Sequence, residues 1–227
     1  MSTQATPAFR KLARIRTLLS FAPLLVTLVL SGCDSDTTKP DPEPSPYLAP
    51  TSPENVVDNI VTAMNLRDAD GYAANFDEEE FIFRFDPIDL ILDNDLPPFW
   101  DYDGETAWSS NCFESSDVFR VSVEWAKGPV EELDESDPDN YMDPTMRKMV
   151  VVGIYLEVEM VNPADPSDPI LFLASGDRAR FYFAPDLNHL IGGQPTWKIV
   201  EWQDIRVEGR PLLSENNSIG RIKAAFR

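Results

Sequence analysis

The stretch "VFRVSVEWA" (Val118–Ala126) decides the fold class of this chain. Successive side chains of a β-strand point to opposite faces, so a strict alternation predicts a strand with one buried and one solvated face. Such half-buried strands are typical of antiparallel sheets, which cover a core on one side. The stretch alternates in this way, with an apolar set of Phe119, Val121, Val123 and Trp125 and a polar set of Arg120, Ser122 and Glu124.

The chain after this stretch continues the strand pattern, and we expect further strands at 149–161, 170–184 and 196–207. In the last of these Trp197 and Trp202 have opposite parity, which indicates a β-bulge or a sheet buried on both faces. Turn-rich segments between the strands predict hairpins, and the acidic insert 127–147 is expected to be an exposed loop. In 170–184 one face is predicted to hold Leu171, Leu173, Ala179, Phe181 and Phe183.

Helices are predicted before the strands. "TSPENVVDNIVTAMNL" has Ser52 as a helix cap, Pro53 in the first turn and apolar residues at helical spacing. A short helix is expected from Asp70, then a strand at Phe81–Phe85 and a helix at "GETAWSSNCFES". The sequence therefore predicts an α+β fold, with N-terminal helices packed on one face of a curved antiparallel sheet of four to six strands.

This order of elements resembles the nuclear transport factor two-like superfamily, also described as cystatin-like or SnoaL-like. The resemblance covers most of residues 52–207 and rests on the helix pair that runs into the Phe-rich strand, the Trp-containing helix and the long strands ending in "WKIVEWQD". It implies a cone-shaped roll with a pocket between helices and sheet, often in a homodimer. Members include ketosteroid isomerase, dehydratases and non-enzymatic binding modules, so the fold does not choose a function.

The N-terminus predicts export. Residues 1–16 are basic, and the apolar run Leu18–Leu30 is too short to span a bilayer but fits the core of a signal peptide. The following "LSGC" resembles a lipobox, the bacterial lipoprotein signal, which implies cleavage between Gly32 and Cys33 and lipid attachment to Cys33. The alternative is an ordinary secretory signal with a chance cysteine. We expect a signal peptide at 1–32, a Pro/Asp-rich tether at 33–53, the α+β domain at 54–210 and a C-terminal tail at 211–227.

The charge restricts the partners. The chain has 19 Lys and Arg against 39 Asp and Glu, a formal net charge of −20. Because phosphate backbones are bound by clustered cations, this composition argues against a nucleic-acid partner. An acidic body also requires a tether for any contact with an anionic membrane. We expect a protein that is exported, lipid-anchored to a bacterial membrane and directed to the periplasm or the exterior.

Few residues suggest catalysis. The one histidine, His189, lies in an expected hairpin turn, which excludes zinc sites built from several histidines. Cys112 is expected to be a buried, inert thiol, because an acylated Cys33 could not pair with it. Neither a metal nor a cofactor is predicted. The polar residues among aromatics are Tyr72, Tyr155, Glu201 and Asp204, but none lies in a matched motif, so no catalytic residue is assigned.

Two functions follow from the predicted roll. The first is a non-catalytic module that binds a small apolar ligand or an envelope protein. The second is an isomerase or dehydratase that uses a carboxylate and a tyrosine in the pocket. Capture of a divalent cation by the acidic insert is a third hypothesis. The residues predicted to line the pocket are Tyr72, Phe76, Phe81, Trp108, Trp125, Phe181, Trp197 and Glu201.

Overall fold

The computed structural model describes residues 44–135, 137, 143–207 and 218–227. The predicted signal peptide, the lipid-attachment residue Cys33 and most of the tether lie outside this part of the chain. Residues 44–227 form one compact unit, so residues 218–227, which the sequence analysis set apart as a tail, belong to the same unit as the sheet. Among the described residues, no helix combines the length and the apolar character that crossing a membrane requires.

Six strands form a single mixed sheet in the order β2-β1-β6-β5-β4-β3. Neighbouring strands are antiparallel except for β1 and β6, which are parallel. This agrees with the predicted number of strands, and the parallel pairing of β1 with β6 is a departure from a purely antiparallel sheet. The strands are β1 (Ile82–Arg84), β2 (Phe99–Asp101), β3 (Val118–Glu132), β4 (Arg147–Met160), β5 (Ile170–Ile191) and β6 (Gln194–Ile205).

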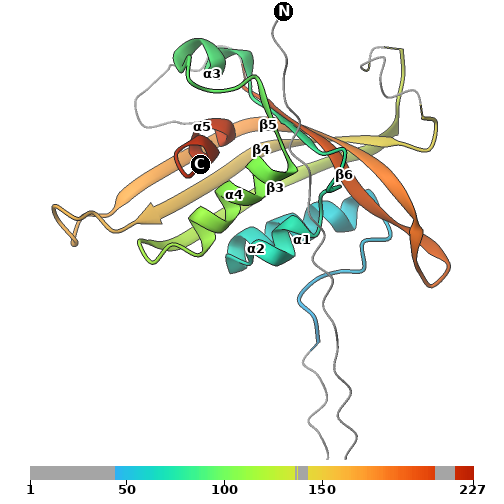
Figure 1. Cartoon of the computed structure of the whole chain (residues 1–227), viewed down its shortest axis with the longest axis horizontal. Helices are drawn as coiled ribbons and strands as arrows, with labels where there is room; N and C mark the ends of the chain where they lie inside the picture. Colours follow the sequence, from blue (N-terminus) through green and yellow to red (C-terminus); the bar gives the residue numbers. More distant parts are fainter. Residues whose placement is uncertain (1–43, 136, 138–142, 208–217) are drawn as a thin grey trace, which may run out of the picture. The chain divides into compact units, whose positions relative to one another are not determined.

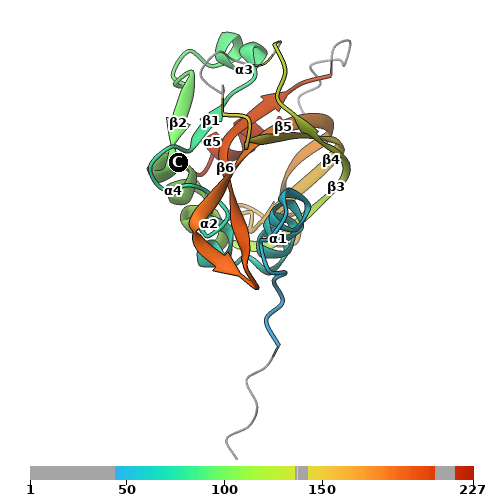
Figure 2. The ribbon, with the colours of Figure 1, turned by 90° about the vertical axis from the view of Figure 1, so that its right-hand side faces the viewer.

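The main helices lie on one face of the curved sheet, as Figures 1 and 2 show. The α+β class and the predicted arrangement of helices over the sheet are thus confirmed. Two short helices were not predicted: α3, which lies between the predicted Phe-rich strand and the predicted Trp-containing helix, and α5, which packs against β5 and α4 and lies in the expected tail. The helices are α1 (Pro53–Leu66), α2 (Ala69–Ala73), α3 (Pro87–Leu92), α4 (Tyr102–Phe113) and α5 (Ile219–Ala224).

Helix α1 is fixed at both ends by polar side chains. The backbone N–H of Asn55 donates to Oγ of the cap residue Ser52 at 3.3 Å, as the sequence predicted. Near the other end, Asn65 joins α1 to the edge strand β3: its Oδ1 accepts from Val123 N at 2.9 Å, and its Nδ2 donates to Val123 O at 3.1 Å. The amide thus extends the hydrogen-bond ladder and sets the position of α1 on the sheet.

β-Bulges change which face several side chains occupy. A register shift lies between Val118 and Arg120, so Val118 is buried and Phe119 is 50% exposed, contrary to the prediction. A second shift lies near Gly153 and Gly176, which both have positive φ. An extra residue inverts the parity of a strand. Before the bulge, Leu171 is therefore exposed and Leu173 is half-buried, and Ala174 faces the core instead. After the bulge, Ala179, Phe181 and Phe183 are buried as predicted.

A β-bulge also explains why Trp197 and Trp202 in β6 have opposite parity. Glu201 pairs with Tyr182 and Ile199 pairs with Phe183, so Val200 is the extra residue between them. Val200 packs on the other face of the sheet with Tyr182 and Met146. Both explanations offered from the sequence therefore apply, because β6 has a bulge and is buried on both faces in this region.

The long hairpins extend further than predicted. β3 continues to Glu132, so the first part of the insert expected to be an exposed loop is paired strand. β5 and β6 continue to a turn at Gly192 and Gly193, whose φ angles are +60° and +83°. Successive left-handed residues define the tight turn that suits the twist of a β-hairpin, and glycine adopts it without a steric penalty. This turn carries the hairpin tip beyond the body of the sheet.

Candidate functional site

Most of the residues predicted to line a pocket are packed together inside the domain. The ring of Tyr72 lies 4.9 Å from that of Phe76 and 5.6 Å from that of Trp108, and Phe76 lies 4.5 Å from Phe81. These four side chains and Phe181 are fully buried, and Phe181 contacts the half-buried Trp125 at 5.9 Å between ring centroids. The structure therefore brings one aromatic cluster together, and its role as a ligand pocket stays a prediction.

The other two predicted residues belong to β6. Trp197, near the start of this strand, is half-buried and packs against the same hydrophobic core. Glu201 is fully buried, accepts hydrogen bonds from Gln203 Nε2 and from Arg84 Nε, the latter at 2.9 Å, and forms an ion pair with Arg84. Charge-assisted hydrogen bonds of this kind fix the position of a buried carboxyl group. Glu201 is therefore a buried, hydrogen-bonded acid.

A carboxylate in α4 is the polar centre of the interior. Glu105 is fully buried, and its Oε1 accepts hydrogen bonds from the hydroxyl of Tyr72 and from Nζ of Lys223. Its Oε2 accepts from the indole Nε1 of Trp100 at 2.9 Å. Burying a carboxylate is unfavourable unless donors replace its water shell, and these three donors do so.

The ammonium group of Lys223 reaches Glu105 from α5. It lies 3.6 Å from the ring centroid of Trp202, 3.9 Å from that of Phe83 and 5.3 Å from that of Trp108. The electron-rich faces of aromatic rings attract a cation at these distances. Burial nevertheless lowers the pKa of Lys223 to about 8, against the opposing influence of Glu105. Burial also raises the pKa of Tyr72 well above its usual value, and the charge of Glu105 adds to that shift.

The first turn of α5 is held by two further buried carboxylates. The backbone N–H of Gly220 donates to Oδ2 of Asp204 at 2.8 Å, and the hydroxyl of Ser218 donates to Oδ2 of Asp89. Burial raises the pKa of both carboxyl groups, in Asp204 to about 8 and against the Gly220 hydrogen bond. Arg206 Nη2 lies 2.9 Å from Asp89 Oδ1 and supplies a compensating charge.

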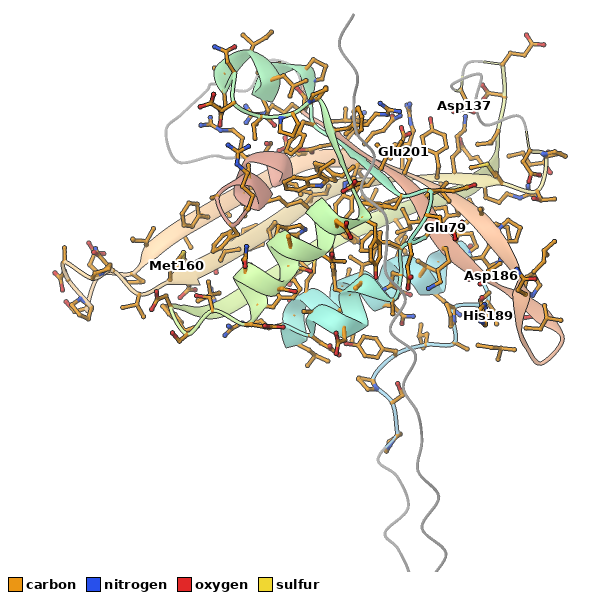
Figure 3. The ribbon with its side chains drawn as sticks, viewed as in Figure 1. Glu79, Asp137, Met160, Asp186, His189 and Glu201 are labelled. Atoms are coloured by element: carbon orange, nitrogen blue, oxygen red, sulfur yellow. The ribbon has the colours of Figure 1, made fainter. Side chains whose placement is uncertain are left out.

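A surface hollow of about 890 Å³ lies at the other end of the domain, between the loop 77–80 and the β5–β6 hairpin. Figure 3 shows Glu79, Asp186 and His189 at this end. Phe76 is the one predicted pocket residue on its wall. The residues that line it are Pro50, Phe76, Asp77, Glu78, Glu79, Glu80, Asp186, Asn188, His189, Leu190, Ile191, Thr196 and Lys198.

The walls of this hollow are acidic. Five carboxylates face one lysine, and Nζ of that lysine, Lys198, donates to the carbonyl of Ala74. The Asp77 carboxylate accepts from the N–H groups of Glu79 and Glu80 at 3.0 and 2.9 Å, which fixes the loop while the glutamate side chains stay exposed. A smaller hollow of about 440 Å³ lies between α1 and β3 and includes Trp125.

Two other residues singled out in the sequence, His189 and Cys112, have structural roles. His189 is exposed, in strand β5 rather than in a turn, and its Nδ1 lies 2.5 Å from Asp186 Oδ2, a contact that lowers the pKa of Asp186. Cys112 is buried, and burial raises the pKa of its thiol to about 12, so it is a core thiol as predicted. Within the described ranges, no group of three or more His, Cys, Asp and Glu side chains is arranged to hold a metal.

Neither Glu105 nor Lys223 is identifiable as a buried polar residue from the sequence. A signal for α5 was present in "SIGRIKAAF": Ser218 caps the helix, and Ile219 and Ile222 are one turn apart. These features identify a short helix with a buried face, but they do not reveal that a lysine shares it. The partner of Lys223 is 118 residues away in the sequence, so the ion pair depends on the tertiary fold.

No protein-family model and no curated protein matches this chain. Solved structures with a similar fold include a ketosteroid isomerase-like protein from Erwinia carotovora atroseptica, with TM-score 0.42, 13% identity and coverage of 68% of this chain and 93% of that one. A domain of unknown function with a cystatin-like fold from Nostoc punctiforme has TM-score 0.42, 14% identity and coverage of 69% and 75%. An NTF-2 like protein of unknown function from Shewanella oneidensis has TM-score 0.36, 9% identity and coverage of 66% and 93%. At these scores the likenesses carry no argument about activity or ligand.

Proposed function

We propose that this domain is a non-catalytic binding module of a lipid-anchored envelope protein, and that it binds a basic, partly apolar segment of a second envelope protein in the acidic hollow. The observation that supports this proposal is the hollow itself, which combines exposed carboxylates at 78–80 with the exposed apolar side chains of Leu190 and Ile191. Leu190 is 59% exposed, and Leu187 on the same hairpin is 69% exposed.

The chemistry of the walls defines the partner. Exposed carboxylates attract Lys and Arg side chains, and an open site of one charge sign increases the rate of association with an oppositely charged partner. The apolar residues provide the buried contact that charge alone does not supply. A segment in which basic and apolar side chains alternate satisfies both requirements, because an extended chain directs successive side chains to opposite sides.

The isomerase or dehydratase alternative is favoured by one observation, the hydrogen bond between Tyr72 and Glu105 in an aromatic environment. A carboxylate beside a tyrosine is the arrangement that such chemistry needs. Both side chains are fully buried, and Lys223 occupies the space beside the carboxylate. Because the interior pair is closed to solvent in the folded domain whereas the hollow is open, we favour binding at the hollow over catalysis in the interior.

The test measures the binding of a fluorescent synthetic peptide in which Lys and Leu alternate, by fluorescence anisotropy at low and physiological salt. The double variant E78K/E80K should weaken binding by at least about tenfold, since two attractive contacts become repulsive. L190S should weaken binding severalfold and change its salt dependence little, because it removes an apolar contact.

The matched control is D165K/D168K, which changes the net charge by the same amount on the loop between β4 and β5. This variant should bind the peptide nearly as tightly as the natural protein. If the control and E78K/E80K weaken binding equally, the attraction depends on net charge and the hollow is not the site.

A further inference from the structure

The ammonium group of Lys223 occupies a cage that the rest of the domain builds. Trp202 comes from β6, Phe83 from β1 and Trp108 from α4, and their rings surround Nζ at the distances given above. Glu105 supplies the anion on the remaining side. Aromatic faces combined with a carboxylate form a typical recognition site for organic ammonium groups. The cage residues belong to residues 83–202, whereas the occupant belongs to the separate segment 218–227.

The walls of the cage are held in place without α5. The ring of Trp202 packs 4.7 Å from that of Phe181, and the ring of Phe83 packs 5.5 Å from that of Trp100. Glu105 is oriented by hydrogen bonds from Tyr72 and Trp100, and neither donor belongs to α5. These contacts remain when Lys223 leaves, so the site is organised before it is occupied.

Helix α5 is an element that can separate from the body locally. It has six residues, and a helix of this length has little stability of its own. Its attachment depends on buried apolar contacts of Ile219 and Ile222 and on polar contacts with Asp89, Asp204 and Glu105. The loss of water around the buried ammonium group and carboxylates opposes the docking of α5 on the domain. A methionine at 223 would fill the same space without this desolvation cost. Local unfolding of such a short element requires far less free energy than global unfolding.

We propose that the cage of Phe83, Glu105, Trp108 and Trp202 is a binding site for a linear aliphatic ammonium ligand, which replaces Lys223 when α5 separates from the domain. Lys223 defines the ligand class, since its side chain is a primary ammonium on a four-carbon stem. The ammonium forms the ion pair and the cation–π contacts, and the whole side chain is fully buried. This site shares no residue with the acidic hollow and does not depend on the function proposed for it.

The first experiment uses the full chain with the substitution K223A, which removes the occupant's stem and charge. n-Butylammonium at pH 7 should raise the melting temperature of this variant, because a ligand that binds only the folded state stabilises it. n-Butanol, which has the same stem without the charge, should bind at least about tenfold more weakly. Adding E105Q to K223A should abolish the difference between the two probes.

The second experiment measures hydrogen exchange of residues 218–227 by mass spectrometry in the natural chain and in K223M. In K223M the methionine side chain is expected to fill the cage and preserve the fold. This variant therefore still tests the proposal if K223A does not fold. n-Butylammonium should accelerate exchange in this segment, and at a lower concentration in K223M, whose methionine cannot form the ion pair with Glu105. n-Butanol at equal concentration should leave exchange unchanged.

Two results would overturn the proposal. Equal stabilisation of K223A by the amine and the alcohol would identify a plain apolar cavity without charge recognition. Unchanged exchange of residues 218–227 in both the natural chain and K223M would show that the amine does not replace α5, whatever it does to K223A.

Discussion

Asp204 and Lys223 are ionisable side chains in a core that otherwise consists mainly of aromatic and aliphatic groups. Burial shifts their pKa values in opposite directions, upward for the acid and downward for the base, because it penalises the charged form of each. Both groups contact or belong to the segment 218–227, so the ionisation of these side chains influences how firmly α5 is held.

Asp204→Asn should change how stability depends on pH. The pKa of Asp204 in the folded chain, about 8, lies above its unfolded value near 4, so the native state binds the proton more tightly. Its stabilising contribution is complete below about pH 4 and is lost as pH rises through 8, by at most about 1.4 kcal/mol per pH unit. Urea unfolding at pH 5 to 8 should show the natural chain losing stability relative to the variant.

The matched control for this prediction is Asp165→Asn. Asp165 is exposed, and hydrogen bonds from the hydroxyl and the backbone N–H of Ser167 lower the pKa of its carboxyl group. The difference in stability between the natural chain and this variant should stay constant between pH 5 and 8, because the Asp165 carboxyl group is ionised in both the folded and the unfolded state there. A constant difference in stability between the natural chain and Asp204→Asn from pH 5 to 8 would contradict the raised pKa of Asp204 in the folded chain.

The roles of some individual residues could be predicted from the sequence, and those of others could not. Ser52 as a cap and Cys112 as a buried thiol follow from local chemistry and are confirmed. Phe119 was assigned to the wrong face, because one bulge shifts the alternation and nothing in the local residue types marks it. The pair of Glu105 and Lys223 could not be predicted, since both residue types are ordinarily found on the surface.

The β5–β6 hairpin is the element that forms one wall of the acidic hollow. Its strands pair as far as Ile191 and Gln194, directly before and after the two turn glycines. The turn therefore controls the register of the tip, and the register places Leu190 and His189 beside the loop 77–80.

Gly192→Val should destabilise the domain by about 1–2 kcal/mol, because a β-branched residue is strained at the positive φ that this position requires. The matched control is Gly192→Asn, since asparagine tolerates the left-handed conformation and should cost much less. No atom outside the turn lies within 4 Å of a Cβ placed at Gly192, so backbone strain and not a steric clash is tested. Thermal unfolding of both variants provides the measurement, and equal losses would contradict this reason.

Elements with strong periodicity were the ones that the sequence identified. The apolar spacing of α1 and the alternation in β3 specify these elements locally, and both are present. The three-residue strand β2 and the six-residue helices α3 and α5 were missed, because segments this short offer few positions in which a periodicity can be recognised. The equally short β1 and α2 were predicted. Their conformation depends on packing against the rest of the domain.

For the whole molecule, the sequence predicted the α+β class from the order of its elements, and the sheet with its covering helices confirms this. The aromatic residues predicted for a pocket are clustered, but only the three-dimensional packing reveals how closely they fill the interior. The acidic hollow was not predicted, because it is formed by segments more than a hundred residues apart in the sequence, 77–80 and 186–198.

The lipid anchor is a prediction for the whole molecule, and Cys33 lies outside the described residues. Cys33→Ala should leave the precursor uncleaved at this site and should prevent stable membrane attachment. The variant lacks the thiol that carries the acyl chains, and stable anchoring requires more than one such membrane-binding group. Fractionation of cells into membrane and soluble material, with metabolic labelling by a fatty acid, provides the measurement. A Cys33→Ala protein that is still processed and membrane-bound would rule out lipid attachment at this residue.

The ion pair between Glu105 and Lys223 also affects the order in which the chain can fold during synthesis. A ribosome makes residue 223 after every strand of the sheet, and 118 residues after Glu105. A nascent chain with its sheet complete therefore still has a carboxylate in an aromatic interior without its main counter-charge. We expect this late intermediate to be the state most prone to aggregation and most dependent on chaperones.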